Sequence, residues 1–126
     1  MSAPHVIFVF LTGIFLAFAQ PVYAADNCTE ELQRGIASWY GSRFAGSLTK
    51  SEEVFNPAQL SAAHPDLPFG TIVKVTNLRN YRSVNVRVND RGAFGHERAI
   101  DVSESAANEL GMIDDGLAPV AIYRCH

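Results

Sequence analysis

The sequence predicts a mainly β protein, most economically a closed barrel that carries one or two short helices. Three observations support this prediction. Four segments have the short, β-branched or alternating pattern of strands, helix signals occur at only two places, and no repeat, low-complexity tract or linker divides the chain. The 126 residues provide one small domain and leave no room for a second.

The first 24 residues have the pattern of a secretory signal peptide. An apolar run over residues 6–19 is too short for a confident membrane span, and the small-residue cleavage pattern Val22-Tyr23-Ala24 follows it. An uncleaved anchor is the alternative, because no Lys or Arg precedes the run. Cleavage would leave residues 25–126 as one periplasmic or secreted domain that is not inserted in the membrane.

Four strands are predicted in the mature chain. Residues 35–41 are short, aromatic and bounded by glycines, and residues 71–78 are rich in β-branched side chains. Residues 83–89 alternate valines with polar residues, and residues 118–125 close the chain. The short connection over residues 79–82 predicts a hairpin between the second and third strands.

Helix signals occur at two places. Asn56 followed by Pro57 has the pattern of an N-cap and a first helical position, which predicts a short helix over AQLSAA. Ser103 begins SESAANELG, where Gly111 supplies a stop, so a second short helix is predicted there.

The two cysteines, Cys28 and Cys125, lie near the two ends of the mature chain. Because an exported protein meets oxidising conditions, we predict a disulfide between them. In the chain-entropy model such a long loop contributes roughly 4 to 5 kcal/mol. The alternative is a lipid-modified Cys28, but residues 25–27 lack the apolar and small residues of a lipobox.

The charge pattern argues against a nucleic-acid binder, since the net charge is -3 and the chain carries an export signal. Residues 67–100 are nevertheless locally basic, which fits either an anionic ligand or arginines on the wet face of a sheet. The histidines and acids lack HExxH or CxxC spacing, so we predict no metal site and no cofactor.

Asp90 follows the alternating strand and is the first candidate for acid chemistry. If the alternation continues one step, its side chain points with the valines toward the core. Desolvation of a carboxyl disfavours the charged form, as a general acid near neutral pH requires. Pattern alone favours the alternative, in which Asp90 is a turn residue beside Gly92, and Arg91 fits a partner that keeps Asp90 ionised.

The other candidates have ordinary structural explanations on pattern alone. A lone histidine such as His64, placed where a helix would stop, usually forms structural hydrogen bonds. Glu53 adjoins Glu52 in a loop, where neighbouring acids are usually solvated. Three aromatic residues fit either a sugar-stacking surface or the core: Trp39, Tyr40 and Phe44.

Three blocks resemble the rare lipoprotein A (RlpA) family of bacterial cell-wall proteins, in the same order and at similar spacing. They are GIASWYG, LSAAHPDLPFGTIVKVTNL and RSVNVRVNDRGAFG…RAIDVSESAANELG, and they span residues 34–111. The resemblance implies a six-stranded double-psi β-barrel, shared with expansin-like domains. It also implies a lytic transglycosylase that cleaves the β-1,4 bond between N-acetylmuramic acid and N-acetylglucosamine in peptidoglycan and leaves a 1,6-anhydro end.

The resemblance also implies roles for individual residues. Asp90, in VNDRG, matches the position of the acid/base, since one carboxyl suffices when the 6-hydroxyl of muramic acid is the nucleophile. His64, in AAHP, matches an active-site histidine, and Glu53 matches a loop glutamate that would stabilise positive charge on the sugar ring. The candidate substrate contacts are Trp39, Tyr40, Arg91 and Asn56.

Three positions depart from the family pattern. Glu52 and Tyr81 stand where the family usually has glycine, and Asn56 stands where it has aspartate. A residue other than glycine restricts the backbone, and Asn56 cannot titrate. Two hypotheses follow, a monomeric lytic transglycosylase acting on glycan strands and a non-catalytic, expansin-like barrel that binds cell-wall carbohydrate.

Overall fold

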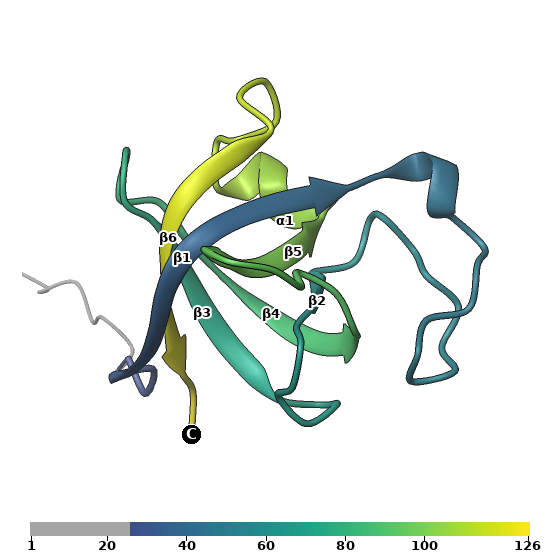
Figure 1. Cartoon of the computed structure of the whole chain (residues 1–126), viewed down its shortest axis with the longest axis horizontal. Helices are drawn as coiled ribbons and strands as arrows, with labels where there is room; N and C mark the ends of the chain where they lie inside the picture. The colour runs from purple at the N-terminus through teal and green to yellow at the C-terminus, as the bar shows by residue number, and fades with distance from the viewer. Residues whose placement is uncertain (1–25) are drawn as a thin grey trace, which may run out of the picture.

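The computed structural model describes residues 26–126, and the predicted signal peptide lies outside these residues. The elements are, in chain order, β1 (Glu30–Tyr40), the 3-10 helix η2 (Ser42–Phe44), β2 (Ser61–Ala63), β3 (Ile72–Asn77), β4 (Ser83–Asp90), β5 (Arg98–Ser103), α1 (Glu104–Glu109) and β6 (Leu117–Arg124). The strands close a barrel in the order β1-β5-β2-β4-β3-β6 (Figure 1). The predicted six-stranded barrel is confirmed.

Two parallel strand pairs give the barrel its topology. β1 is parallel to β5, and β2 is parallel to β4, whereas the other neighbouring strands are antiparallel. An up-and-down barrel would have antiparallel pairs only. The mixed order is that of a double-psi barrel, and it brings segments that are distant in sequence side by side.

The four predicted strands are confirmed as β1, β3, β4 and β6, and the predicted hairpin joins β3 to β4. Tyr81 in this hairpin has a φ of +61°, in the left-handed region that favours glycine. β2 and β5 were not predicted. β2 has only three residues, which is too short for a visible alternation.

The predicted helix after Asn56 is wrong. The Oδ1 atom of Asn56 accepts a hydrogen bond from the Ala58 N–H at 2.9 Å, so Asn56 forms a tight turn instead of an N-cap. Residues 61–63 form β2 and are buried between β4 and β5. Pairing in the sheet therefore outweighs the local helix signals.

The second predicted helix is confirmed as α1. The Ser103 hydroxyl accepts a hydrogen bond from the Ala106 N–H at 3.3 Å, which is the predicted N-cap. Ala106 and Ala107 are buried, and α1 packs against β1, β4 and β5. Small side chains on this face allow the helix to approach the barrel closely.

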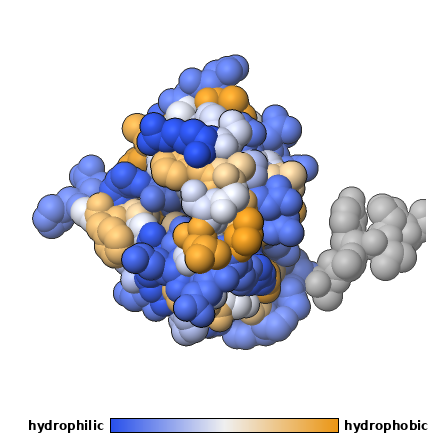
Figure 2. Space-filling view, turned by 90° about the vertical axis from the view of Figure 1, so that its right-hand side faces the viewer, coloured by the Kyte–Doolittle hydropathy of each residue, from blue (hydrophilic) through white to orange (hydrophobic). Residues whose placement is uncertain are grey.

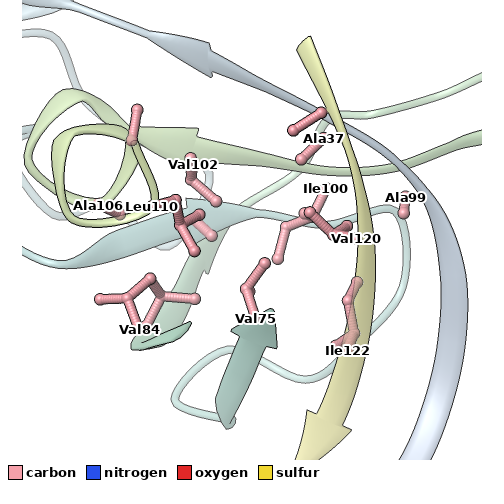
Figure 3. Packing of buried hydrophobic residues seen from close by; sticks show 14 of the residues in the cluster. Ala37, Val75, Val84, Ala99, Ile100, Val102, Ala106, Leu110, Val120 and Ile122 are labelled. Carbon is pink, nitrogen blue, oxygen red and sulfur yellow. The ribbon is translucent and has the colours of Figure 1, made fainter. Parts of the chain in front are cut away.

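The core fills the barrel with branched aliphatic side chains from β3, β4, β5 and β6 (Figure 3). Figure 3 shows Val75, Ile100, Val120 and Ile122 converging from different strands. Alternate residues of β4 are buried from Val84 to Val88, as its pattern predicted. The hydrophobic core thus fixes the strand register that positions the polar residues at the strand ends.

The predicted disulfide between Cys28 and Cys125 is confirmed, and it joins the residues that flank β1 and β6. These two strands pair antiparallel along most of their length. Within residues 26–126, no helix combines the length and apolar character that crossing a membrane requires.

Candidate active site

A cavity of about 240 Å³ lies where β1, β2 and β4 end, under the loop that follows η2. Its aromatic wall consists of Tyr40, Phe44 and Phe55. Its charged lining consists of Asp90, Arg91 and Asp101. Figure 2 views the molecule from the side of η2 and this loop, where hydrophobic residues gather among hydrophilic ones. Such a combination is typical of a ligand site.

The sheet register places two aspartates on either side of Ala63. In the parallel pair of β2 and β4, Ala63 is the partner of Asp90, and in the antiparallel pair of β2 and β5 it is the partner of Asp101. Because neighbouring strands lie about 4.8 Å apart, the two aspartates are about two strand spacings apart. The small side chain of Ala63 leaves the space between the two carboxyls open.

A β-bulge in β4 directs Asp90 toward this cavity. Ala62 pairs with Val88 and Ala63 pairs with Asp90, so Asn89 is an extra residue in β4. Val88 and Asn89 are both buried, which interrupts the alternation, and Asp90 is half-buried at the cavity. Asp90 is the last residue of the strand and not part of a turn. Bulges commonly redirect side chains next to functional sites.

The hydrogen bonds of Asp90 involve one carboxyl oxygen. Its Oδ1 accepts from the backbone N–H groups of Lys50 and Arg91, both at 2.9 Å. Within residues 26–126, Oδ2 accepts no hydrogen bond. The guanidinium of Arg91 instead donates to the carbonyl oxygens of Leu67 at 2.7 Å and His64 at 3.3 Å. Arg91 thus holds the loop that follows β2 in place through these hydrogen bonds. In the described chain it forms no ion pair with Asp90.

Asp101 was missed by the sequence reasoning, although it lines the same cavity. Its Oδ1 accepts from the Ser38 hydroxyl at 2.5 Å and is paired with Arg98, and its Oδ2 accepts from the Ala93 N–H at 3.0 Å. The available signal was a carboxylate in the otherwise apolar segment AIDVS, since such residues are rarely buried without partners.

Tyr40 connects the aromatic wall to the two aspartates. Its ring packs on Phe55, with centroids 4.7 Å apart, and edge-on to Phe44 at 6.1 Å. Burial raises the pKa of the Tyr40 phenol far above its ordinary value, and the negative charges of Asp90 and Asp101 raise it further. The phenol therefore stays protonated and able to donate a hydrogen bond.

His64 is buried behind the cavity and does not line it. Its Nδ1 accepts from the N–H groups of Asp66 and Leu67, both at 3.1 Å. The proton is therefore assigned to Nε2, which donates to the Gln33 Oε1 at 3.0 Å. Burial lowers the pKa of the His64 imidazole, so the ring is neutral at pH 7.

Glu53 lies in the loop that covers the cavity, but its side chain does not line the cavity. Its carboxylate forms a two-point ion pair with Arg87, with one contact of 2.8 Å, and accepts from the Ser51 hydroxyl at 3.2 Å. The hydrogen bonds from Arg87 lower the pKa of Glu53 to about 2. The preceding residue, Glu52, has a φ of +70°, in the region that favours glycine.

The structure therefore brings together only part of the predicted set. Asp90, Tyr40 and Arg91 meet at the cavity with Phe44. The predicted residues outside it are His64, Glu53, Asn56 and Trp39. Asn56 is exposed in its turn, whereas Trp39 packs partly against the core. Within residues 26–126, no three His, Cys, Asp or Glu side chains are grouped to hold a metal ion.

Comparison with known proteins finds one family and one fold. The model of a family described as lytic transglycolase matches residues 32–122. The chain is 53% identical over 92 residues to the endolytic peptidoglycan transglycosylase RlpA of Campylobacter jejuni, covering 73% of this chain and 34% of that protein. It is 58% identical over 91 residues to a probable RlpA of Nostoc sp., covering 71% and 24%. The chain thus spans about a third or less of these two relatives.

Among solved structures, the expansin of Clavibacter michiganensis is similar with a TM-score of 0.60. The two sequences are 20% identical, and the match covers 74% of this chain and 50% of the expansin. At this level of identity the similarity supports the double-psi barrel fold alone.

Proposed function

The chain belongs to the lytic transglycolase family, and on this premise we propose that it is a peptidoglycan lytic transglycosylase. The proposed reaction cleaves the β-1,4 bond between N-acetylmuramic acid and N-acetylglucosamine and forms a 1,6-anhydro end. The observation that carries the proposal is Asp90, whose carboxyl lines an aromatic-walled cavity at the end of a bulged strand. Its place of action would be the periplasm or cell exterior, as a monomer.

Asp90 serves in this proposal as both acid and base. Its carboxylic acid donates a proton to the glycosidic oxygen as the bond to the anomeric carbon breaks. The 6-hydroxyl of the muramic acid then attacks that carbon and gives its proton to the Asp90 carboxylate, so no water is consumed. The geometry supports this role, because two backbone N–H groups fix Oδ1 and Oδ2 has no protein partner among the described residues.

Asp101 and Tyr40 support the charge changes at the same cavity. Asp101 is held as a carboxylate by Arg98, Ser38 and a backbone N–H, so it provides a fixed negative charge. Such a charge stabilises the positive charge that develops on the sugar ring. Tyr40 keeps its proton, and its hydroxyl is buried without a hydrogen-bond partner among the described residues. The faces of the aromatic rings suit the apolar side of the sugar.

Glu53, His64 and Asn56 act as positioning residues in this proposal. Glu53 and Arg87 tie the covering loop to β4, close to the bulge. The His64 ring orders the following loop by accepting from two backbone N–H groups, and the backbone N–H of His64 donates to the Asp90 carbonyl oxygen at 3.1 Å. The turn at Asn56 leads into β2.

A second candidate function is a non-catalytic barrel that binds cell-wall carbohydrate. Glu52 favours it, because a left-handed backbone at a residue other than glycine costs about 1 kcal/mol or more and constrains the covering loop. A variant of the Clavibacter expansin, which has this fold, is solved in complex with cellohexaose. The two functions share the cavity and differ in whether Asp90 transfers a proton.

The deciding experiment is digestion of purified sacculi with the mature protein, analysed by mass spectrometry. We expect anhydro-muropeptides from the wild type. Asp90→Asn should reduce their release by at least about 100-fold, since it removes general acid–base catalysis. Asp114→Asn, at an exposed position remote from the cavity, is the matched control and should retain activity.

If the wild type releases no anhydro ends but pellets with sacculi, the binding function replaces the enzyme. A Glu52→Gly variant that then gains activity would locate the defect in the covering loop. Circular dichroism of each variant separates loss of chemistry from loss of fold.

A further inference from the structure

A second depression, of about 470 Å³, adjoins the Asp90 cavity. The two share Tyr40 and Phe44, so they lie side by side and a chain of sugars can extend from one to the other. A third depression, of about 540 Å³, continues beyond Glu104 of α1. Together they form an extended track, which suits a polymer better than a single sugar.

The backbone at Gly41 keeps the second depression open. A Cβ atom there would lie 2.8 Å from the Trp39 ring and 3.4 Å from the Glu104 Oε1. The absence of a side chain thus lets the Trp39 indole and the Glu104 carboxylate both reach this depression. Trp39 does not line the Asp90 cavity and lines this second depression instead.

Arg43 supplies an unpaired positive charge at the same place. It is the one arginine within residues 26–126 that forms neither an ion pair nor a hydrogen bond with a protein group. Its guanidinium lies 4.7 Å from the centroid of the Phe44 ring, which holds it at the edge of the depression. The Glu104 carboxylate likewise has no hydrogen-bond or ion-pair partner in the described chain.

We propose that this depression is a saccharide subsite in which Arg43 binds a carboxylate carried by the glycan strand. A guanidinium recognises a carboxylate through two parallel hydrogen bonds, and its stacking on Phe44 reduces the entropy lost on binding. The Glu104 carboxylate accepts hydrogen bonds from sugar hydroxyl or acetamido groups in the same subsite. Muramic acid carries such a carboxylate on its lactyl group, and stem peptides carry others.

The inference rests on the proposed function, because it assumes that the glycan also occupies the Asp90 cavity. The test therefore measures binding in an Asp90→Asn background, where no turnover is needed. Its failure is distinguishable from failure of the lytic reaction, which the sacculus digest measures separately.

The probes are peptide-free glycan strands, the same strands with carboxylates reduced to alcohols, and strands that retain stem peptides. Arg43→Gln should weaken binding of the unreduced peptide-free strands by about tenfold, as expected for a lost charged hydrogen bond. Binding of the reduced strands should not change. Arg43→Lys should recover part of the loss. Arg34→Gln, at an exposed arginine of β1 outside the track, is the matched control and should have no effect.

The third probe identifies the source of the carboxylate. Dependence on Arg43 for peptide-free strands alone assigns the lactyl carboxylate, because the stem peptide converts that carboxylate to an amide. Dependence that persists on peptide-bearing strands shows that Arg43 also binds a carboxylate of the peptide. An equal loss on native and reduced strands, no loss on either, or no binding by the Asp90→Asn parent would overturn the proposal. Because Arg43 is exposed, its substitution should leave the fold intact, which near-ultraviolet circular dichroism checks.

Discussion

At the scale of single residues, the partners of each carboxyl decide what it can do in the cavity. Asp90 has one oxygen fixed by two backbone N–H groups and one oxygen without a protein partner in the described chain. Both oxygens of Asp101 are engaged, by Ser38, Arg98 and a backbone N–H. A group that transfers a proton needs an oxygen that is free to contact the substrate, which Asp90 has. A group that provides a fixed charge needs both oxygens held in place, as those of Asp101 are.

His64 makes a testable contribution to stability. His64→Leu leaves the Asp66 and Leu67 N–H groups without an acceptor, which should cost about 1 to 3 kcal/mol of unfolding free energy. Burial lowers the pKa of His64, so below about pH 6.5 the unfolded state binds a proton that the folded state does not. Wild-type stability should therefore fall as pH drops through this range.

Urea unfolding at pH 7.5 and at pH 5.0 measures this effect. The difference in stability between the wild type and His64→Leu should be larger at pH 7.5 and smaller at pH 5.0. A difference that does not change with pH would show that His64 has the same pKa in the folded and the unfolded protein.

The ion pair between Glu53 and Arg87 should contribute less to the free energy of unfolding than the hydrogen bonds of His64. Both side chains are partly exposed, so Glu53→Gln should cost no more than about 1 kcal/mol at pH 7. The hydrogen bonds from Arg87 lower the pKa of Glu53 from its ordinary value of 4.5 to about 2, so the contribution is complete above about pH 4.5 and is lost as pH falls toward 2.

Chemical denaturation of wild type and Glu53→Gln from pH 7 to pH 2 provides the measurement. Arg87→Gln is the reciprocal variant and should give a similar loss at pH 7. A loss of several kcal/mol would mean that the pair also fixes the loop over the cavity.

The sequence analysis singled out Asp90 and Tyr40, which line the cavity, but it did not predict the arrangement around them. The alternation ended at the correct place, yet the bulge at Asn89 depends on pairing with β2, a strand that local pattern did not reveal. One partner of each of His64 and Asp101 comes from a distant segment, Gln33 for His64 and Ser38 for Asp101. Register between such segments is a long-range property that composition and periodicity do not contain.

At the scale of elements, the strands with a clear β-branched or alternating pattern were predicted, whereas β2 and β5 were not. β4 and β6 carry their own hydrophobic pattern, whereas β2 forms because β4 and β5 offer it two edges. The segment after Asn56 has the capping residues of a helix. Its residues 61–63 instead pair with β4 and β5, which satisfies their backbone groups in the sheet. Local propensity is a weak predictor where two strands compete for the same segment.

The connection between β4 and β5 supplies a prediction about the two aspartates. A Cβ at Gly92 would lie 2.9 Å from the Asp101 Oδ2 and 3.0 Å from the Ala63 Cβ. Gly92→Ala should therefore destabilise the protein by about 1 to 3 kcal/mol and displace Asp101. The rate of anhydro-muropeptide release should fall by more than the loss of folded protein explains.

Gly46→Ala is the comparison for this experiment. A Cβ at Gly46 meets no atom within 4 Å, and its cost comes from a φ of +87° alone. It should lower stability and leave the activity of the folded fraction nearly unchanged. Equal effects of the two substitutions on activity would contradict a specific role for the space beside Asp101.

At the scale of the whole molecule, closure of the barrel brings the two ends of the described chain together. β1 pairs with β6 over eight registered residue pairs, and the disulfide lies beyond this pairing. The Asp90 cavity lies at the other end of β1, where Tyr40 is the last residue of the strand. The disulfide and the Asp90 cavity thus lie at opposite ends of β1.

This separation predicts that the disulfide affects stability and not activity. The bridge spans 97 residues in sequence, and the double variant Cys28→Ser, Cys125→Ser should lower the free energy of unfolding by about 2 to 5 kcal/mol. The loss arises mainly because the unfolded chain gains conformational freedom. At a temperature where the variant stays folded, its release of anhydro-muropeptides should match that of the wild type. Reductant should lower wild-type stability to the level of the variant and have no further effect on the variant. If activity falls while near-ultraviolet circular dichroism is unchanged, the paired ends must instead influence the cavity through β1, because that strand connects them directly.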